Sequence, residues 1–188
     1  RKGKQVLNVA PPNEARAVAA RIGAQLVQLL ALYRAGDNSL RLAIEDHDLT
    51  DFCQEVTSET PLPPGCNTRI ESDTGAAAVL GAWAFDAYQV KLVLQEALRN
   101  AVRHGNNRVR FAVTAQAGGG LRFTVSDDGP GFPQQVLNGE APEMNSGSSG
   151  IGLAFARLIA ERHATPIGRR GRIELANDRG AVFALVLP

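Results

Sequence analysis

The sequence of 188 residues lacks the features that mark several classes of protein. Its two cysteines, Cys53 and Cys66, are too few for a disulfide framework and lack metal-ligand spacing. No window approaches the roughly eighteen uncharged apolar residues of a membrane span. The basic start, Arg1 to Lys4, is not followed by an apolar signal-peptide core. These absences favour a cytoplasmic location, either for a free domain or for part of a larger protein.

An excess of charge of either sign is also missing. Twenty Lys and Arg residues face 19 Asp and Glu residues, for a net charge of +1, so the electrostatic footprint of a nucleic-acid-binding protein is absent. With 44% hydrophobic residues the chain is not disordered, and its length suits one or two small domains with a core.

The first legible element is a helix over residues 13–36. Asn13 can cap it after the prolines, and Gly36 ends it. Its apolar residues recur at steps of three and four, and they are Val18, Ile22, Leu26, Leu29, Leu30 and Tyr33. Such a stripe must be buried against a second helix or another chain.

The rest of the chain mixes helices with hairpins. Patterning predicts strands at 40–44, 68–71, 109–113, 121–125, 172–176 and 181–187, and helices at 48–56, 86–104 and 150–162. Residues 60–67 are predicted to form a loop, and 75–84 is ambiguous. Asp86 and Gln89 form a capping-box pattern. This order favours an α+β fold, a two-layer sandwich with helices on one face of a mixed, largely antiparallel sheet.

The first of three chemical clusters is a polar face on the helix 86–104. Glu96, Asn100, Arg103 and His104 follow one another at steps of four, three and one, which places them along one side. A carboxylate one turn from a carboxamide can hold a hydrated divalent cation, and Arg103 can contact a phosphate. Taken alone, the pattern also fits an ordinary solvated helix face.

The second cluster follows a strand directly and runs from Asp127 through Asp128, Gly129, Pro130 and Gly131 to Phe132. A carboxylate beside two glycines can accept hydrogen bonds from an exocyclic amine of a flat ligand. We expect Asp128 to point to solvent or to cap the turn. The alternative is an ordinary turn without a ligand.

The third cluster is glycine-rich and leads into a helix. Residues 147–153 have small side chains before the helix, which leaves backbone N–H groups and the positive end of the dipole free for phosphate. Neither a Walker P-loop nor a dinucleotide fingerprint is present. The alternative is a flexible linker.

Together and in this order, the three clusters resemble the N, G1 and G2 boxes of the ATPase superfamily shared by gyrase, the heat-shock chaperone, MutL and sensor histidine kinases. Residues 40–188 are most similar to the ATP-binding catalytic domain of a two-component sensor histidine kinase. Residues 1–39 then resemble part of the dimerisation and phosphotransfer helices, with the second helix at 13–36. The first G2 glycine is replaced by Ser148.

The resemblance implies ATP and Mg²⁺ as cofactors. It implies that Asn100 and Glu96 are the metal and catalytic residues, and that Asp127 recognises the adenine amino group. Residues 133–149 correspond to the ATP lid. The nucleotide-binding set that it implies is Asn100, Arg103, His104, Asp127, Gly129, Gly131, Phe132, Ser149, Gly150, Ile151, Gly152 and Leu153.

The activity implied is transfer of the ATP γ-phosphoryl to a histidine and then to an aspartate of a response regulator receiver domain. Partners are that regulator and a second copy bound through helix 13–35, with no nucleic acid and no membrane segment. No His-Glu-x-x-Arg/Asn-x-Pro phosphoacceptor box occurs, and we expect His47 to be a surface residue. The alternatives are a degenerate module that binds nucleotide or a partner without autokinase activity, and an anti-sigma-factor serine kinase.

Overall fold

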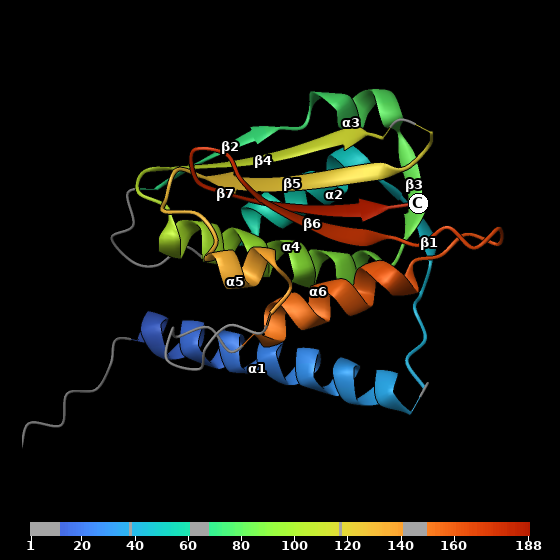
Figure 1. Ribbon diagram of the computed structural model, residues 1–188, viewed down its shortest axis with the longest axis horizontal. Coiled ribbons are helices and arrows are strands. Elements are labelled where there is room, and N and C mark those ends of the chain that lie inside the picture. The colour runs from blue at the N-terminus through green and yellow to red at the C-terminus, as the bar shows by residue number, and fades with distance from the viewer. Residues whose placement is uncertain (1–11, 38, 61–67, 117, 141–149) are drawn as a thin grey trace, which may run out of the picture.

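A five-stranded sheet forms one layer of the computed structural model, which describes residues 12–37, 39–60, 68–116, 118–140 and 150–188. The strands are, in spatial order, β2 (Arg69–Asp73), β4 (Arg108–Ala115), β5 (Leu121–Asp127), β7 (Ala181–Leu187) and β6 (Arg172–Asn177). β2 pairs with β4 in parallel, and the other three pairings are antiparallel. Helices form the second layer on one face of the sheet (Figure 1). The predicted α+β fold is confirmed.

Strict alternation along β4 and β5 decides which face is covered. Phe111 and Phe123 are fully buried toward the helices, whereas Arg108 and Arg110 lie on the open face. Helices α4 (Ala87–His104) and α6 (Ile151–Arg162) pack on the buried face. Helix α2 (Leu49–Ser58) adds Phe52, whose ring lies 5.7 Å from that of Phe123. The core therefore fixes α4 and α6 against one side of the sheet.

Two other expected helices and the two hairpins are also confirmed. Helix α1 spans Pro12–Gly36, and Asp48 caps α2 by accepting from the N–H groups of Thr50 and Asp51. The ambiguous stretch 75–84 holds helix α3 (Gly75–Leu80) and the start of strand β3 (Ala82–Phe85). Within the predicted lid, helix α5 spans Gln134–Leu137. The predicted loop at 61–67, lid residues 141–149 and residues 1–11 lie outside the described residues.

The predicted strand at 40–44 is wrong. Its backbone pairs with side chains and not with another strand: Ala43 N–H donates to Asp86 Oδ2 (2.9 Å), and Arg162 Nη1 donates to the carbonyl of Leu40 (3.3 Å). The strand in this region is β1 (Glu45–Asp48), which pairs with β3 in an antiparallel two-stranded sheet. Alternating side chains therefore marked an extended segment, but its partners are distant side chains.

Helix α1 lies along α6 (Figure 1), and its apolar stripe is exposed. Gln28 and Ala31 are buried, whereas Leu26 is 61% exposed and Leu30 47% exposed. The carbonyl of Ala35 near the end of α1 accepts a hydrogen bond from Arg162 Nη2 (3.4 Å). Among the described residues, no helix combines the length and the apolar character that crossing a membrane requires.

Candidate nucleotide site

Glu96 on α4 lies against the first turn of α6. A Cβ added at Gly152 would lie 3.1 Å from Glu96 Cγ, so the glycine gives room for this carboxylate to lie beside the helix start. Glu96 Oε2 pairs with Arg99 Nη2 at 2.5 Å, and the Glu96 side chain is 27% exposed. The first and third clusters, which are more than fifty residues apart in sequence, therefore meet at this contact.

The remaining polar residues of α4 face solvent. Asn100, Arg103 and His104 are exposed, and no side-chain hydrogen bond or ion pair holds them within the described part of the chain. Asn100 follows Glu96 by one helical turn, so its carboxamide lies on the same side of α4. Arg103 and His104 lie in the last turn. These groups are thus available to a ligand.

The loop after β5 packs directly on the end of α4. A Cβ at Gly129 would lie 2.3 Å from the carbonyl oxygen of His104, so no other residue fits without movement. Asp127 Oδ1 accepts from the N–H groups of Gly129 (2.8 Å) and Ala181 (3.2 Å). The second carboxylate oxygen, Oδ2, accepts no hydrogen bond from the described residues. One oxygen of Asp127 therefore orients the side chain and leaves the other for a ligand.

Asp128, in contrast, holds the turn between α4 and β4. Its Oδ1 accepts from the N–H groups of Asn106 (2.9 Å), Asn107 (3.0 Å) and Arg108 (3.2 Å). The bonds from Asn107 and Arg108 are the main reason why the pKa of this carboxyl lies below its ordinary value. Asp128 therefore caps a turn, one of its two expected roles, but this turn lies between α4 and β4 and not in its own loop.

Helix α6 begins at Gly150, which has the left-handed φ of 66° that favours glycine. Ile151, Gly152 and Leu153 occupy the first turn and are half-buried. The first N–H groups of a helix have no partner within it, so they and the dipole favour an anion here. Ser149 lies outside the described residues. The start of α6 and Glu96 thus place an anion-attracting helix end beside a carboxylate.

The C-terminal hairpin contributes residues that the sequence did not reveal. Asn177 forms two hydrogen bonds with the backbone of Phe132, and Ala181 donates to Asp127. The turn between them, Asn177 to Gly180, has the composition of an ordinary hairpin turn, so no signal in the sequence pointed to these contacts.

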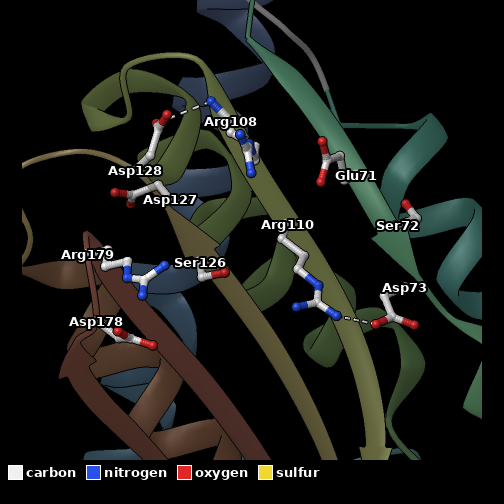
Figure 2. Close-up of a pocket in the computed structure, with 10 residues that line it drawn as sticks. All are labelled: Glu71, Ser72, Asp73, Arg108, Arg110, Ser126, Asp127, Asp128, Asp178 and Arg179. Carbon is white, nitrogen blue, oxygen red and sulfur yellow. Dashed lines mark hydrogen bonds and ion pairs between the residues drawn. The ribbon is translucent and has the colours of Figure 1, made fainter.

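A hollow of about 660 Å³ lies on the open face of the sheet, where Asp127 and Asp128 border it (Figure 2). Asp73 pairs with Arg110, and the carboxylates of Asp127 and Asp128 are bonded to backbone N–H groups. The groups that remain are the cations Arg108 and Arg179 and the anions Glu71 and Asp178. Their charges balance, and the hollow lies across the sheet from α6, so it does not provide the phosphate site.

Comparisons with known proteins find a matching family and similar sequences. A family profile described as histidine kinase-, DNA gyrase B- and HSP90-like ATPase matches residues 85–188. The chain is 28% identical over 176 residues to the signal transduction histidine-protein kinase AfsQ2 of Streptomyces coelicolor. The aligned region covers 89% of this chain and 31% of that protein. It is 24% identical over 185 residues to the adaptive-response sensory kinase SasA of a Synechococcus strain, covering 94% and 48%.

Solved structures show the same fold. The histidine kinase AdeS of Acinetobacter baumannii superposes with a TM-score of 0.67 at 16% identity, covering 95% of this chain and 85% of that chain. Full-length ShkA in complex with AMPPNP superposes with a TM-score of 0.72 at 20% identity, covering 96% and 40%. The chain spans about a third to a half of the length of the curated relatives it matches.

Proposed function

The chain belongs to the histidine kinase-, DNA gyrase B- and HSP90-like ATPases, and from this premise we propose that it is the ATP-binding catalytic region of a sensor histidine kinase. The observation that carries the proposal is the contact between Glu96 and Gly152, together with the packing of Gly129 on the end of α4. These contacts bring the three clusters together along the C-terminal half of α4. Its reaction is transfer of the ATP γ-phosphoryl to a histidine, from which an aspartate of a response regulator receives it.

In this proposal Asp127 selects the base. Its Oδ1 is occupied by two backbone N–H groups, and Oδ2 accepts from the exocyclic amine of adenine. Guanine presents a carbonyl oxygen at that position and is repelled. Gly129, Gly131 and Phe132 form the loop beside the base.

The phosphates lie at the start of α6 in this proposal. Gly150, Ile151, Gly152 and Leu153 surround the free N–H groups of the first turn, and Arg103 and His104 supply further donors from the exposed end of α4. By the resemblance, Ser149 belongs to the nucleotide-binding set and residues 133–149 are the ATP lid, of which 141–149 lie outside the described residues. Phosphoryl transfer needs positioning and charge neutralisation more than covalent chemistry, and these groups supply both.

Helix α4 offers two side chains with oxygen ligands for Mg²⁺, Glu96 and Asn100. Within the described residues, no group of three or more His, Cys, Asp or Glu side chains could hold a metal ion, and in this proposal waters and the nucleotide supply the other ligands. The oxygens of Asn100 and Glu96 would hold it, and Mg²⁺ accepts such an arrangement because it keeps several waters. When bound, it neutralises charge on the phosphates. Glu96 would also orient the reacting group.

Self-association is the second part of the proposal. Residues 1–39 act as part of a dimerisation region, residues 40–188 as the catalytic domain, and the stripe of α1 binds a second copy through helix 13–35. The stripe is exposed in the single chain, as the apolar face of a dimerisation helix would be.

The alternative is a nucleotide-binding module without autokinase activity. His163 is 4% exposed and both its ring nitrogens are hydrogen-bonded, so it is not a phosphoacceptor. Incubation with γ-labelled ATP, alone and with a histidine-containing dimerisation domain, distinguishes the two. Acid-labile, base-stable label supports the kinase, binding of ATP without label supports the module, and a lack of ATP binding contradicts both.

A further inference from the structure

Asn177, the last residue of β6, binds both backbone polar groups of Phe132. Its Oδ1 accepts from Phe132 N–H at 2.7 Å, and its Nδ2 donates to the carbonyl of Phe132 at 3.0 Å. The orientation of the carboxamide is thereby determined, because an N–H can only donate and a carbonyl can only accept. The two residues are 45 positions apart, so the bond joins the loop after β5 to the C-terminal hairpin.

Gly131 makes this close approach possible. A Cβ at this position would lie 2.7 Å from both Cγ and Oδ1 of Asn177, and the backbone has a φ of 84°, which favours glycine. Gly131, which the resemblance assigns to the nucleotide site, thus also packs against Asn177. Any side chain at 131 would push Asn177 away from Phe132.

The same hairpin holds the other end of the loop. Ala181 N–H donates to Asp127 Oδ1, and a Cβ at Gly180 would lie 1.9 Å from the carbonyl oxygen of Asp127. Asp127 and Phe132, the two ends of the loop, are therefore both fixed by residues 177–181. The turn lies beside Asp127: Figure 2 shows Arg179, a residue of this turn, next to it.

Asn177 is itself exposed and lies on the edge strand of the sheet. Asn177 therefore does not contribute to the hydrophobic core. Its two hydrogen bonds fix the C-terminal end of a loop whose other end is held through Asp127, Asp128 and Gly129, and that loop carries the carboxylate proposed to read the base.

We propose that Asn177 is a positioning residue for base recognition, which holds loop 127–132 so that Asp127 presents its free oxygen to the adenine amine. This inference rests on the proposed function. Asn177 acts through the loop and does not touch the nucleotide. It determines how well adenine is distinguished from guanine.

The test compares Asn177→Ala with the unchanged protein by calorimetric titration with ADP and GDP. We expect ADP affinity to fall by about five- to tenfold, the value of one or two net hydrogen bonds. GDP affinity should not fall, because the carboxylate repels the carbonyl oxygen of guanine, so the ADP-to-GDP preference falls by at least the same factor. Hydrogen exchange should show faster exchange of the Phe132 amide.

Two further variants make the result specific. Asp178→Ala changes the next residue of the same turn and should leave both affinities unchanged. Gly131→Ala should lower the ADP-to-GDP preference as Asn177→Ala does, because its side chain clashes with that of Asn177. The loss in the double variant should be smaller than the sum of the two single losses, because the shorter side chain at position 177 no longer clashes with residue 131.

The outcomes separate this inference from the proposed function. An unchanged protein that does not bind ADP contradicts the proposed function. An unchanged protein that prefers ADP, with an Asn177→Ala variant of equal preference, overturns only the role of Asn177. Equal losses of ADP and GDP affinity together with a lower melting temperature would indicate a structural role and would also overturn it.

Discussion

The backbone N–H of Asp86 donates a hydrogen bond to Nε2 of the buried His163 at 3.0 Å. Nδ1 of the same ring lies 2.7 Å from the carbonyl oxygen of Ile159, so the ring is neutral and carries its proton on Nδ1. Asp86 begins α4, which carries Glu96 and Asn100, and His163 ends α6, whose first turn holds Gly152. One imidazole therefore joins the two helices that build the site.

Stability should depend on pH through His163. Burial places its pKa below the ordinary value of 6.5, although the bond to Ile159 and the charge of Asp86 act in the other direction. The folded state thus favours the neutral ring. Its stabilising contribution is fully present above 6.5, and it is lost as the pH falls from there through the lower folded pKa.

We expect His163→Phe to lower the free energy of unfolding at pH 7.5 by about 1–3 kcal/mol, because the Asp86 N–H loses its acceptor in a buried place. The difference between the variant and the unchanged protein should narrow as the pH falls below 6.5, because only the latter loses the contribution of a neutral ring. Chemical denaturation at several pH values measures it. A difference that stays constant with pH would contradict the assignment, since the two proteins share every other titratable group.

The neighbours Asp127 and Asp128 should differ in what they support. Asp128→Ala removes the acceptor for three backbone N–H groups, so we expect the variant to have a lower melting temperature at pH 7. Its stability should also depend less on acid pH than the stability of the unchanged protein. Because the pKa of Asp128 is lowered in the folded state, its contribution is present above the unfolded value of 3.8 and is lost as the pH falls through the folded value. Thermal unfolding at pH 7 and pH 3 compares the variant with Asp178→Ala, whose melting temperature should not change.

Asp127→Asn is the sharper change for the ligand. The amide keeps an oxygen for the N–H groups of Gly129 and Ala181, and its NH₂ group then faces the adenine amine. ADP affinity should fall by about ten- to a hundredfold, the loss of a hydrogen bond to a charged acceptor. Calorimetric titration with ADP and GDP measures it, and equal affinity of both proteins for ADP would show that Asp127 only braces the loop.

Local patterns predicted the elements well but not the contacts between them. The spacing of Glu96 and Asn100 indicated a shared helix face, whereas the packing of Glu96 on Gly152 depends on how α4 and α6 lie on the sheet. The capping residue Asp86 was predicted, since its bond to Gln89 N–H is local, but its bond to His163 is not.

The failures have the same physical origin. The strand expected at 40–44 shows the right alternation, yet alternation says nothing about partners, and here these are the side chains of Asp86 and Arg162. Asn177 carries no signal of its contacts in the sequence, because Asn is common in turns. Its role follows only from the position of Phe132, 45 residues earlier.

The metal dependence of ATP binding should pass through Asn100. We expect Asn100→Ala to weaken ATP binding in the presence of Mg²⁺ and to leave binding in EDTA unchanged, because the carboxamide acts only through the cation. Asn100 is exposed and unbonded among the described residues, so the melting temperature should not move. Titration with and without Mg²⁺ measures the effect. An equal loss under both conditions would assign Asn100 to the nucleotide directly, and no loss would remove it from the site.

Self-association should depend on the exposed stripe of α1. Leu26 and Leu30 are 61% and 47% exposed in the single chain, and burial of such a side chain stabilises by about 1.5–3 kcal/mol. Leu26→Asp combined with Leu30→Asp places two charges in the proposed contact, so sedimentation should show a monomer where the unchanged protein is a dimer. Gln54→Asp is the control, because it adds a charge to an exposed position on another helix, α2. The folded domain should keep its melting temperature and ADP affinity in both variants, because the buried contacts of α1 with α6 involve Gln28 and Ala31. An unchanged protein that sediments as a monomer, or a double variant that still dimerises, would contradict the assignment of this face.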